Sequence, residues 1–295
     1  MSIVVNTPHS HIGRIIVDQL LAAGAAVTVI SRDAERAAPL AARGARVVIG
    51  SIDDPATLDA AFQGADQLFW LTPPHFVPHQ AQYIAGLADL LNSKARGLRR
   101  VVVLSSTGAH NRDTEGHLGP VGLLLTIEEA FRAAVPHVLA LRPAFFMENL
   151  LRDLPTLQGP GALFTVAPID APFPMVATQD IGQRAAEALL DPSWGGHQYR
   201  GVHGPHDITY RQIADAISAA IGRPIQAIQV TLDQAKAGMA QAGLPPFAVE
   251  LYGNLYAGFI DGRLAPAEPR DAFSTTQTDI ETFARAVIAP AFQAG

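Results

Sequence analysis

The chain has 295 residues, 48% of them hydrophobic, and a formal net charge of −6. It is long enough for a large buried core, and its acidic balance leaves no electrostatic footprint for binding nucleic acid. The chain contains no cysteine, which excludes disulfides and thiol catalysis. No apolar run reaches the roughly 18 residues of a membrane span, and the first residues lack a signal-peptide pattern. We therefore expect a cytoplasmic protein that works without a membrane.

Short apolar runs alternate with amphipathic segments along the first half of the chain. The apolar runs predict strands, and the segments between them carry helix signals such as Asp54-Pro55, a good N-cap followed by a proline in the first turn. This β-α-β-α order predicts a parallel sheet with helices on both faces. The predicted strands are residues 3–5, 26–30, 47–49, 67–71 and 100–104, and the predicted helices begin at residues 12, 33, 54 and 76, the last reaching residue 91.

The pattern becomes irregular from about Pro143. Helices are predicted at 178–190, at 209–221 and over 232–260, the last broken at 243–246. We expect an α/β fold in which a doubly wound parallel sheet, a Rossmann-like dinucleotide-binding core, occupies residues 1–150. A smaller C-terminal α/β region, residues 151–295, is expected to pack on this core and bind the substrate.

The turn after the first strand is an altered phosphate-binding loop. A Rossmann loop normally uses three glycines, but here Thr7 and Ser10 occupy the first two positions and only Gly13 remains. Pro8 also removes one backbone donor. The helix after Ser10 still projects N–H groups, so we expect a weakened loop. A vestigial loop in a protein that uses no cofactor is the alternative.

Arg32, at the end of the second strand, indicates which dinucleotide would bind. This position is about 20 residues past the loop, where NAD-binding folds place an acidic residue on the ribose. A guanidinium can instead pair with a 2′-phosphate, so we expect NADP, with NAD possible. The alternative is an exposed arginine at the start of a helix.

The remaining candidate residues follow the carboxyl ends of other strands, where α/β folds bind ligands. Histidines are candidate acids or bases because their pKa lies near neutrality, although a single histidine is more often a surface or cap residue. The i, i+4 pair of His75 and His79 is not expected to bind a metal, since Pro78 lies between them. We expect the cofactor at Thr7, Ser10, His11, Ile12, Arg32, Ile52, Leu71, Thr72, Pro73 and Ser105, catalysis at His75, His110 and Ser105, and a substrate pocket at His75, Phe145, Phe146, Met147 and Asn149.

Taken together, these segments resemble the NmrA-like branch of the atypical short-chain dehydrogenase/reductase superfamily. Residues 141–149 and 180–181 carry the most specific part of the resemblance, which covers nearly the whole chain. It implies NAD(P) binding at the loops named above, with functions that range from quinone or imine reduction to redox-sensing regulation. Ser51 departs from the family, which commonly has an acidic residue there. The other matching segments are 11–14, 31–33, 53–54, 71–74, 104–106, 174–176, 204–205 and 208–210.

The helix predicted near residues 123–132 contains neither the tyrosine nor the lysine that ordinary short-chain dehydrogenases use as an acid pair. A hydride can still pass to an activated acceptor that needs little acid–base help. We expect an NADP(H)-dependent oxidoreductase that reduces a small quinone, enone or imine. Two alternatives stay open: a non-catalytic nucleotide-sensing regulator, and a cofactor-free cyclase or isomerase that uses the former nicotinamide cleft. A homodimer is also left open.

Overall fold

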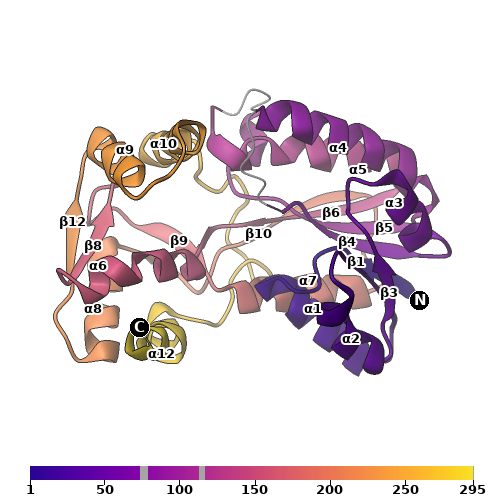
Figure 1. The fold of residues 1–295 in the computed structure, drawn as a ribbon, viewed down its shortest axis with the longest axis horizontal. Coiled ribbons are helices and arrows are strands. Elements are labelled where there is room, and N and C mark those ends of the chain that lie inside the picture. The colour runs from indigo at the N-terminus through magenta and orange to yellow at the C-terminus, as the bar shows by residue number, and fades with distance from the viewer. Residues whose placement is uncertain (74–78, 113–116, 295) are drawn as a thin grey trace.

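A seven-stranded parallel sheet organises the fold in the computed structural model, which describes residues 1–73, 79–112 and 117–294 (Figure 1). The classic Rossmann order runs through its first six strands, so the predicted doubly wound sheet is confirmed. From one edge to the other the strands are β10 (His197–Val202), β6 (His137–Pro143), β5 (Arg100–Leu104), β4 (Gln67–Leu71), β1 (Ser2–Val5), β2 (Ala26–Ser31) and β3 (Arg46–Ile49).

Helices cover both faces of this sheet (Figure 1). Because successive strand side chains point to opposite faces, Val4 enters one core while Ile3 and Val5 enter the other. In the first core the buried rings of Trp70 and Phe131 meet edge to face, 5.8 Å apart. The helices α3 (Pro55–Phe62), α4 (Gln80–Lys94) and α5 (Leu124–Ala134) lie on that face, and α1 (His11–Ala22), α2 (Ala34–Ala42) and α7 (Thr178–Leu190) lie on the other.

The C-terminal part builds its own core from two small sheets and a group of helices. One sheet joins β11 (Asp207–Ile208), β9 (Phe173–Val176) and β7 (Phe145–Phe146), and the other joins β12 (Gln226–Gln229) and β8 (Ala162–Thr165). The helices are α6 (Leu154–Gln158), α8 (Tyr210–Ile221), α9 (Leu232–Gln241), α10 (Pro246–Ile260), α11 (Ile280–Phe283) and α12 (Ala289–Ala294), with a π-helical turn η5 (Ala284–Ile288). Short 3-10 turns are η1 (Ala95–Gly97), η2 (Ala109–Asn111), η3 (Gly119–Val121) and η4 (Met147–Asp153).

Two elements from beyond residue 150 complete the Rossmann layer. β10 pairs in parallel with β6 at the sheet edge, and α7 packs on α1. A Cβ at Gly182 of α7 would lie 2.9 Å from the side chain of Ile15, so the missing side chain lets the two helices approach closely. The expected division between residues 1–150 and 151–295 stays a prediction.

The predicted helix over residues 76–91 is observed as α4, which reaches Lys94; residues 76–78 lie outside the described part of the chain. The strands at 67–71 and 100–104 and the helix at 178–190 have the bounds expected. β6 and β10 were not predicted. Within the described ranges, no helix combines the length and apolar character needed to cross a membrane.

Candidate cofactor and substrate site

Asn6 ties the carboxyl ends of the two central strands together. Its buried amide donates from Nδ2 to the carbonyl of Leu71 (2.8 Å) and accepts at Oδ1 from the Leu71 N–H (2.9 Å). Both ends of the amide are therefore used in joining β1 to β4. Asn6 sets the position from which the altered loop departs.

The loop after Asn6 keeps a compact turn without its first two glycines. Among the described residues other than glycine, only His79 and Arg112 have a positive φ, so Thr7 and Ser10 are not strained by their side chains. Ser10 is instead the N-cap of α1, where its Oγ accepts from the N–H of Gly13 (2.9 Å) and donates to the Thr7 carbonyl (2.9 Å). Serine at the second glycine position therefore gives the loop an N-cap for α1 where a glycine would give only a flexible turn.

Gly13 is the glycine that this turn still needs. A Cβ built there would lie 1.9 Å from the Thr7 carbonyl oxygen, far inside contact distance. The loop therefore folds back directly onto the first turn of α1. This close approach explains why Gly13 is retained while the other two glycine positions carry side chains.

Unused donors face the place that a pyrophosphate takes in Rossmann folds. The first N–H groups of a helix have no partner within the helix, and Ser10 satisfies only that of Gly13. The N–H groups of His11 and Ile12 are thus left for a ligand. Thr7 Oγ1 is buried without a hydrogen-bond partner, an arrangement that a bound phosphate oxygen would satisfy.

A basic group lies at the end of β2. Arg32 and Arg36 are exposed, and neither forms an ion pair with a described residue. Asp33 caps α2 by accepting from the Arg36 N–H (3.0 Å). His9 reaches this corner from the loop, with Nε2 3.2 Å from Ser31 Oγ. Burial lowers the pKa of His9, the charge of Arg36 lowers it further, and Asp33 opposes both effects.

The other predicted cofactor residues lie at or after the carboxyl ends of β3, β4 and β5, and they differ in exposure. Ile52, which follows β3, packs into the sheet core. Leu71, Thr72 and Pro73 are half-buried at the end of β4, and Thr72 Oγ1 accepts a hydrogen bond from Trp70 Nε1 (3.0 Å).

Ser105, at the end of the neighbouring strand β5, is buried, with its Oγ unpartnered. Its backbone N–H donates to the Leu141 carbonyl (2.8 Å). Within the described ranges, the hydroxyl is thus without a hydrogen-bond partner at the carboxyl edge of the sheet.

Only one of the two predicted catalytic histidines lies in the described part of the chain. His110 is exposed in η2, and His75 lies outside the described residues. A catalytic role for these two histidines stays a prediction. The described residues contain no group of three His, Asp or Glu placed to hold a metal.

Phe145, a predicted pocket residue, belongs to an aromatic cluster in the C-terminal part. The ring of Phe145 lies 6.1 Å from that of Phe173 and 6.0 Å from that of Phe259. Phe173 in turn stacks on Tyr210 at 5.1 Å. Phe145, Phe146 and Asn149 are half-buried, whereas Met147 is only 1% exposed and belongs to the C-terminal core.

Sequence reasoning did not identify Asp153 at the end of η4. Burial raises the pKa of this carboxyl to about 6, and the charge of Arg152 only partly opposes the rise. Its negative charge also helps to raise the pKa of Tyr210 and Tyr256, whose pKa values burial raises most. No motif marks this group, because its members come from η4, α8 and α10 and meet only in the fold.

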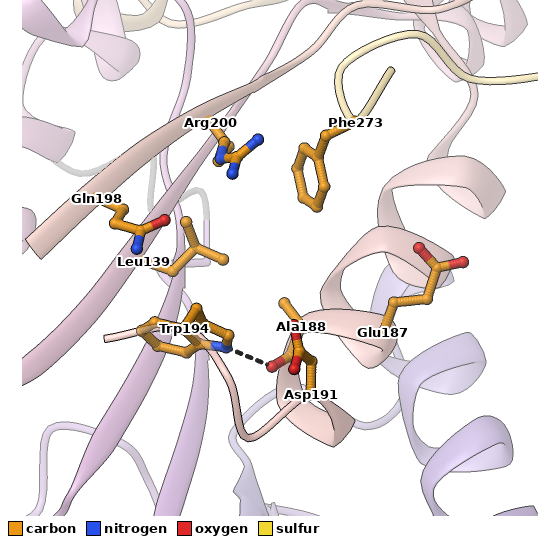
Figure 2. A pocket seen from close by; sticks show the side chains of 8 residues that line it. All are labelled: Leu139, Glu187, Ala188, Asp191, Trp194, Gln198, Arg200 and Phe273. Carbon is orange, nitrogen blue, oxygen red and sulfur yellow. Dashed lines mark hydrogen bonds between the residues drawn. The ribbon is translucent and has the colours of Figure 1, made fainter. Parts of the chain in front are cut away.

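A pocket of about 230 Å³ lies between α7 and the edge strands β6 and β10 (Figure 2). Trp194 and Phe273 border it, and Trp194 Nε1 donates to the Ala188 carbonyl (2.7 Å). Its charged groups already have partners: Glu187 pairs with Arg184, and Arg200 with Asp271. It is lined from the start of β10 and the middle of β6, away from the carboxyl ends where Thr7 and Ser105 lie.

Known proteins resemble the chain over most of its length. The family model described as the NmrA-like family matches residues 2–254. An NAD(P)H azoreductase of Xenophilus azovorans is 31% identical over 250 residues, 83% of each chain. A (4-alkanoyl-5-oxo-2,5-dihydrofuran-3-yl)methyl phosphate reductase of Streptomyces griseus subsp. griseus is 30% identical over 238 residues, 80% of each. The triphenylmethane reductase of Citrobacter sp., solved with NADP(H), has a TM-score of 0.80 at 21% identity and covers 97% of this chain and 100% of its own.

Proposed function

This chain belongs to the NmrA-like family, and we propose that it is an NADP(H)-dependent oxidoreductase that reduces a small activated acceptor. Two curated relatives at 30% identity or more are named as reductases, which supports the class of reaction. The observation that carries the proposal is the loop itself: it turns without strain, caps α1 and leaves Thr7 Oγ1 buried and unpartnered. A loop that no longer bound a cofactor would not need to keep these features.

The residues of the site fit a dinucleotide phosphate. The N–H groups of His11 and Ile12, with Thr7 Oγ1, would hold the pyrophosphate. The guanidinium of Arg32, which forms no ion pair with a described residue, would hold a 2′-phosphate, which favours NADP over NAD. NADPH, when bound, supplies the hydride. Ser105 and Thr72, at the ends of adjacent strands, would border the reacting end.

The acceptor that this chain suits is flat, apolar and already activated. The half-buried rings of Phe145 and Phe259, which pack on the C-terminal core, offer aromatic surface rather than charged groups. α5 carries no Tyr-x-x-x-Lys pair, the group with which ordinary short-chain dehydrogenases protonate an alkoxide. Quinones, enones and iminium ions need the least such help, and azo compounds and triarylmethane dyes, named for similar proteins, share this electrophilic, extended character.

The missing acid pair also supports a second candidate, a nucleotide-sensing regulator that binds NADP(H) without turnover. In either role we propose a cytoplasmic protein without a nucleic-acid partner, in keeping with its net charge of −6. Sedimentation of the purified protein tests whether it forms the homodimer left open above.

The test is oxidation of NADPH, followed by absorbance, with a quinone, an enone, an azo dye and an iminium compound offered separately. We expect turnover with at least one of them, faster with NADPH than with NADH. Binding of NADPH without turnover of any acceptor class would favour the regulator. Turnover of an acceptor with no added nucleotide would instead contradict the proposed hydride source.

A further inference from the structure

His9 takes a defined place in the corner where Arg32 and Arg36 meet the phosphate loop. Ser31 Oγ donates its single hydroxyl proton to the carbonyl of Asp33 (2.9 Å). The 3.2 Å contact between His9 Nε2 and Ser31 Oγ is therefore made by a proton on Nε2. Nδ1 has no hydrogen-bond partner among the described residues, so it is the atom left to meet a ligand.

The ring is held near the point where an NADP 2′-phosphate is expected. Ser31 is the last residue of β2, and Arg32 follows it directly. His9 also interacts electrostatically with Arg36, whose N–H is bound by Asp33. His9 of the β1–α1 loop and Arg36 in the first turn of α2 thus lie near each other, and Arg32 lies between them in the chain at the end of β2.

Resting on the proposed function, we propose that His9 is a specificity determinant for the 2′-phosphate: in its charged form, Nδ1–H donates to the phosphate together with Arg32 and Arg36. Nδ1 of a neutral ring with its proton on Nε2 is an acceptor, so it gains a donor only by taking up a proton. The preference for NADPH over NADH should therefore strengthen as the pH falls through the range in which histidine titrates.

The surroundings of His9 set the sign of this dependence. Without ligand, burial and the Arg36 charge lower the pKa of the ring, so it is neutral at neutral pH. A bound dianion adds an opposite charge beside the ring and raises that pKa, so binding takes up a proton. The ionisable groups that act on the ring are Arg36 and Asp33; Arg32 and Glu35 are their neighbours in the chain, and His11 follows two residues after His9 at the start of α1.

The experiment compares wild type with His9→Gln, whose amide can still bond to Ser31 but cannot titrate. Binding of NADPH and of NADH is measured by fluorescence between about pH 6 and about pH 8. The phosphate itself has a second pKa of about 6, and this contribution is common to both proteins. As the pH rises over this range, the ratio of NADPH affinity to NADH affinity should fall. We expect this fall to be roughly tenfold larger in wild type than in His9→Gln. His206→Gln, at an exposed histidine outside the site, should behave as wild type.

Calorimetry gives a readout that needs no turnover. Titrating 2′,5′-ADP in two buffers of different ionisation enthalpy measures the protons bound, and wild type should take up more than His9→Gln. Equal proton uptake and an equal pH dependence of the affinity ratio in the two proteins would overturn the role of His9. Absence of NADPH binding to wild type would instead overturn the proposed function, so the two failures are distinguishable. Unaltered far-ultraviolet circular dichroism of His9→Gln ensures that a folded protein is compared.

Discussion

Single residues decide how the loop works, and the sequence shows part of this. The loss of two glycines and the presence of Arg32 were readable from the sequence, because motif positions are fixed by spacing. That Ser10 becomes a helix cap was not, since it depends on the backbone conformation that the loop adopts. His9 and Asp153 owe their properties to neighbours distant in sequence, which spacing cannot reveal.

Gly13→Ala tests the close approach of the loop to α1. The new Cβ would lie 1.9 Å from the Thr7 carbonyl oxygen, so the loop must move. We expect a loss of about 1–3 kcal/mol in the free energy of unfolding, measured in urea, together with weaker NADPH binding. Gly86→Ala is the matched control: this helical glycine has no atom within 4 Å of the new Cβ, and the change should stabilise by about 0.5–1 kcal/mol. Equal effects of the two substitutions would refute the steric account.

Asp153→Asn tests the burial of the η4 carboxyl. Its folded pKa of about 6 exceeds the value of 3.8 in an unfolded chain, so the folded state prefers the protonated form. The associated stability is complete below the unfolded pKa and is lost as the pH rises through the folded pKa. Asparagine carries no charge to bury and removes this loss. We therefore expect the free energy of unfolding, measured in urea, to rise by roughly 1–2 kcal/mol near pH 8 and to be unchanged near pH 4. A gain that does not change with pH would show that charge burial is not its cause.

Elements with strong local signals were predicted well, whereas elements fixed by distant partners were not. The helix 178–190 has an amphipathic pattern that its sequence carries alone. β10 reads His-Gln-Tyr-Arg-Gly-Val, without the apolar run of a buried strand, because it is a sheet edge paired only with β6. β6 is almost fully buried, but the prolines at 136 and 143 interrupt the apolar run from which a strand would be predicted.

A buried ion pair joins α5 to β6. Arg142 binds Glu128 through two nitrogens (3.0 and 2.8 Å) and Glu268 through a third (2.7 Å). Arg142→Leu leaves both carboxylates buried without their cation, so we expect a loss of about 3–5 kcal/mol in chemical denaturation. Arg211→Leu removes an exposed pair with Asp170 and should cost less than about 1 kcal/mol. Similar losses in the two variants would contradict the importance of burial.

At the scale of the whole molecule, the Rossmann layer and the C-terminal part have separate hydrophobic cores. The layer carries the phosphate loop and Arg32, and the C-terminal part carries the aromatic cluster around Phe173. The fold class and the class of cofactor could be predicted, since both follow from the order of strands and turns. The aromatic cluster could be predicted only at Phe145, because its other rings come from β9, α8 and α10, which no local motif connects.

The central claim is that the altered loop still binds NADP(H). The most direct measurement is a fluorescence titration of the purified protein with NADPH, alongside Arg32→Gln. We predict saturable binding with a Kd in the range of about 1–100 μM, weakened roughly tenfold or more by Arg32→Gln, with little change in NADH binding. Absence of saturable NADPH binding up to about 1 mM in the folded wild-type protein would contradict the account.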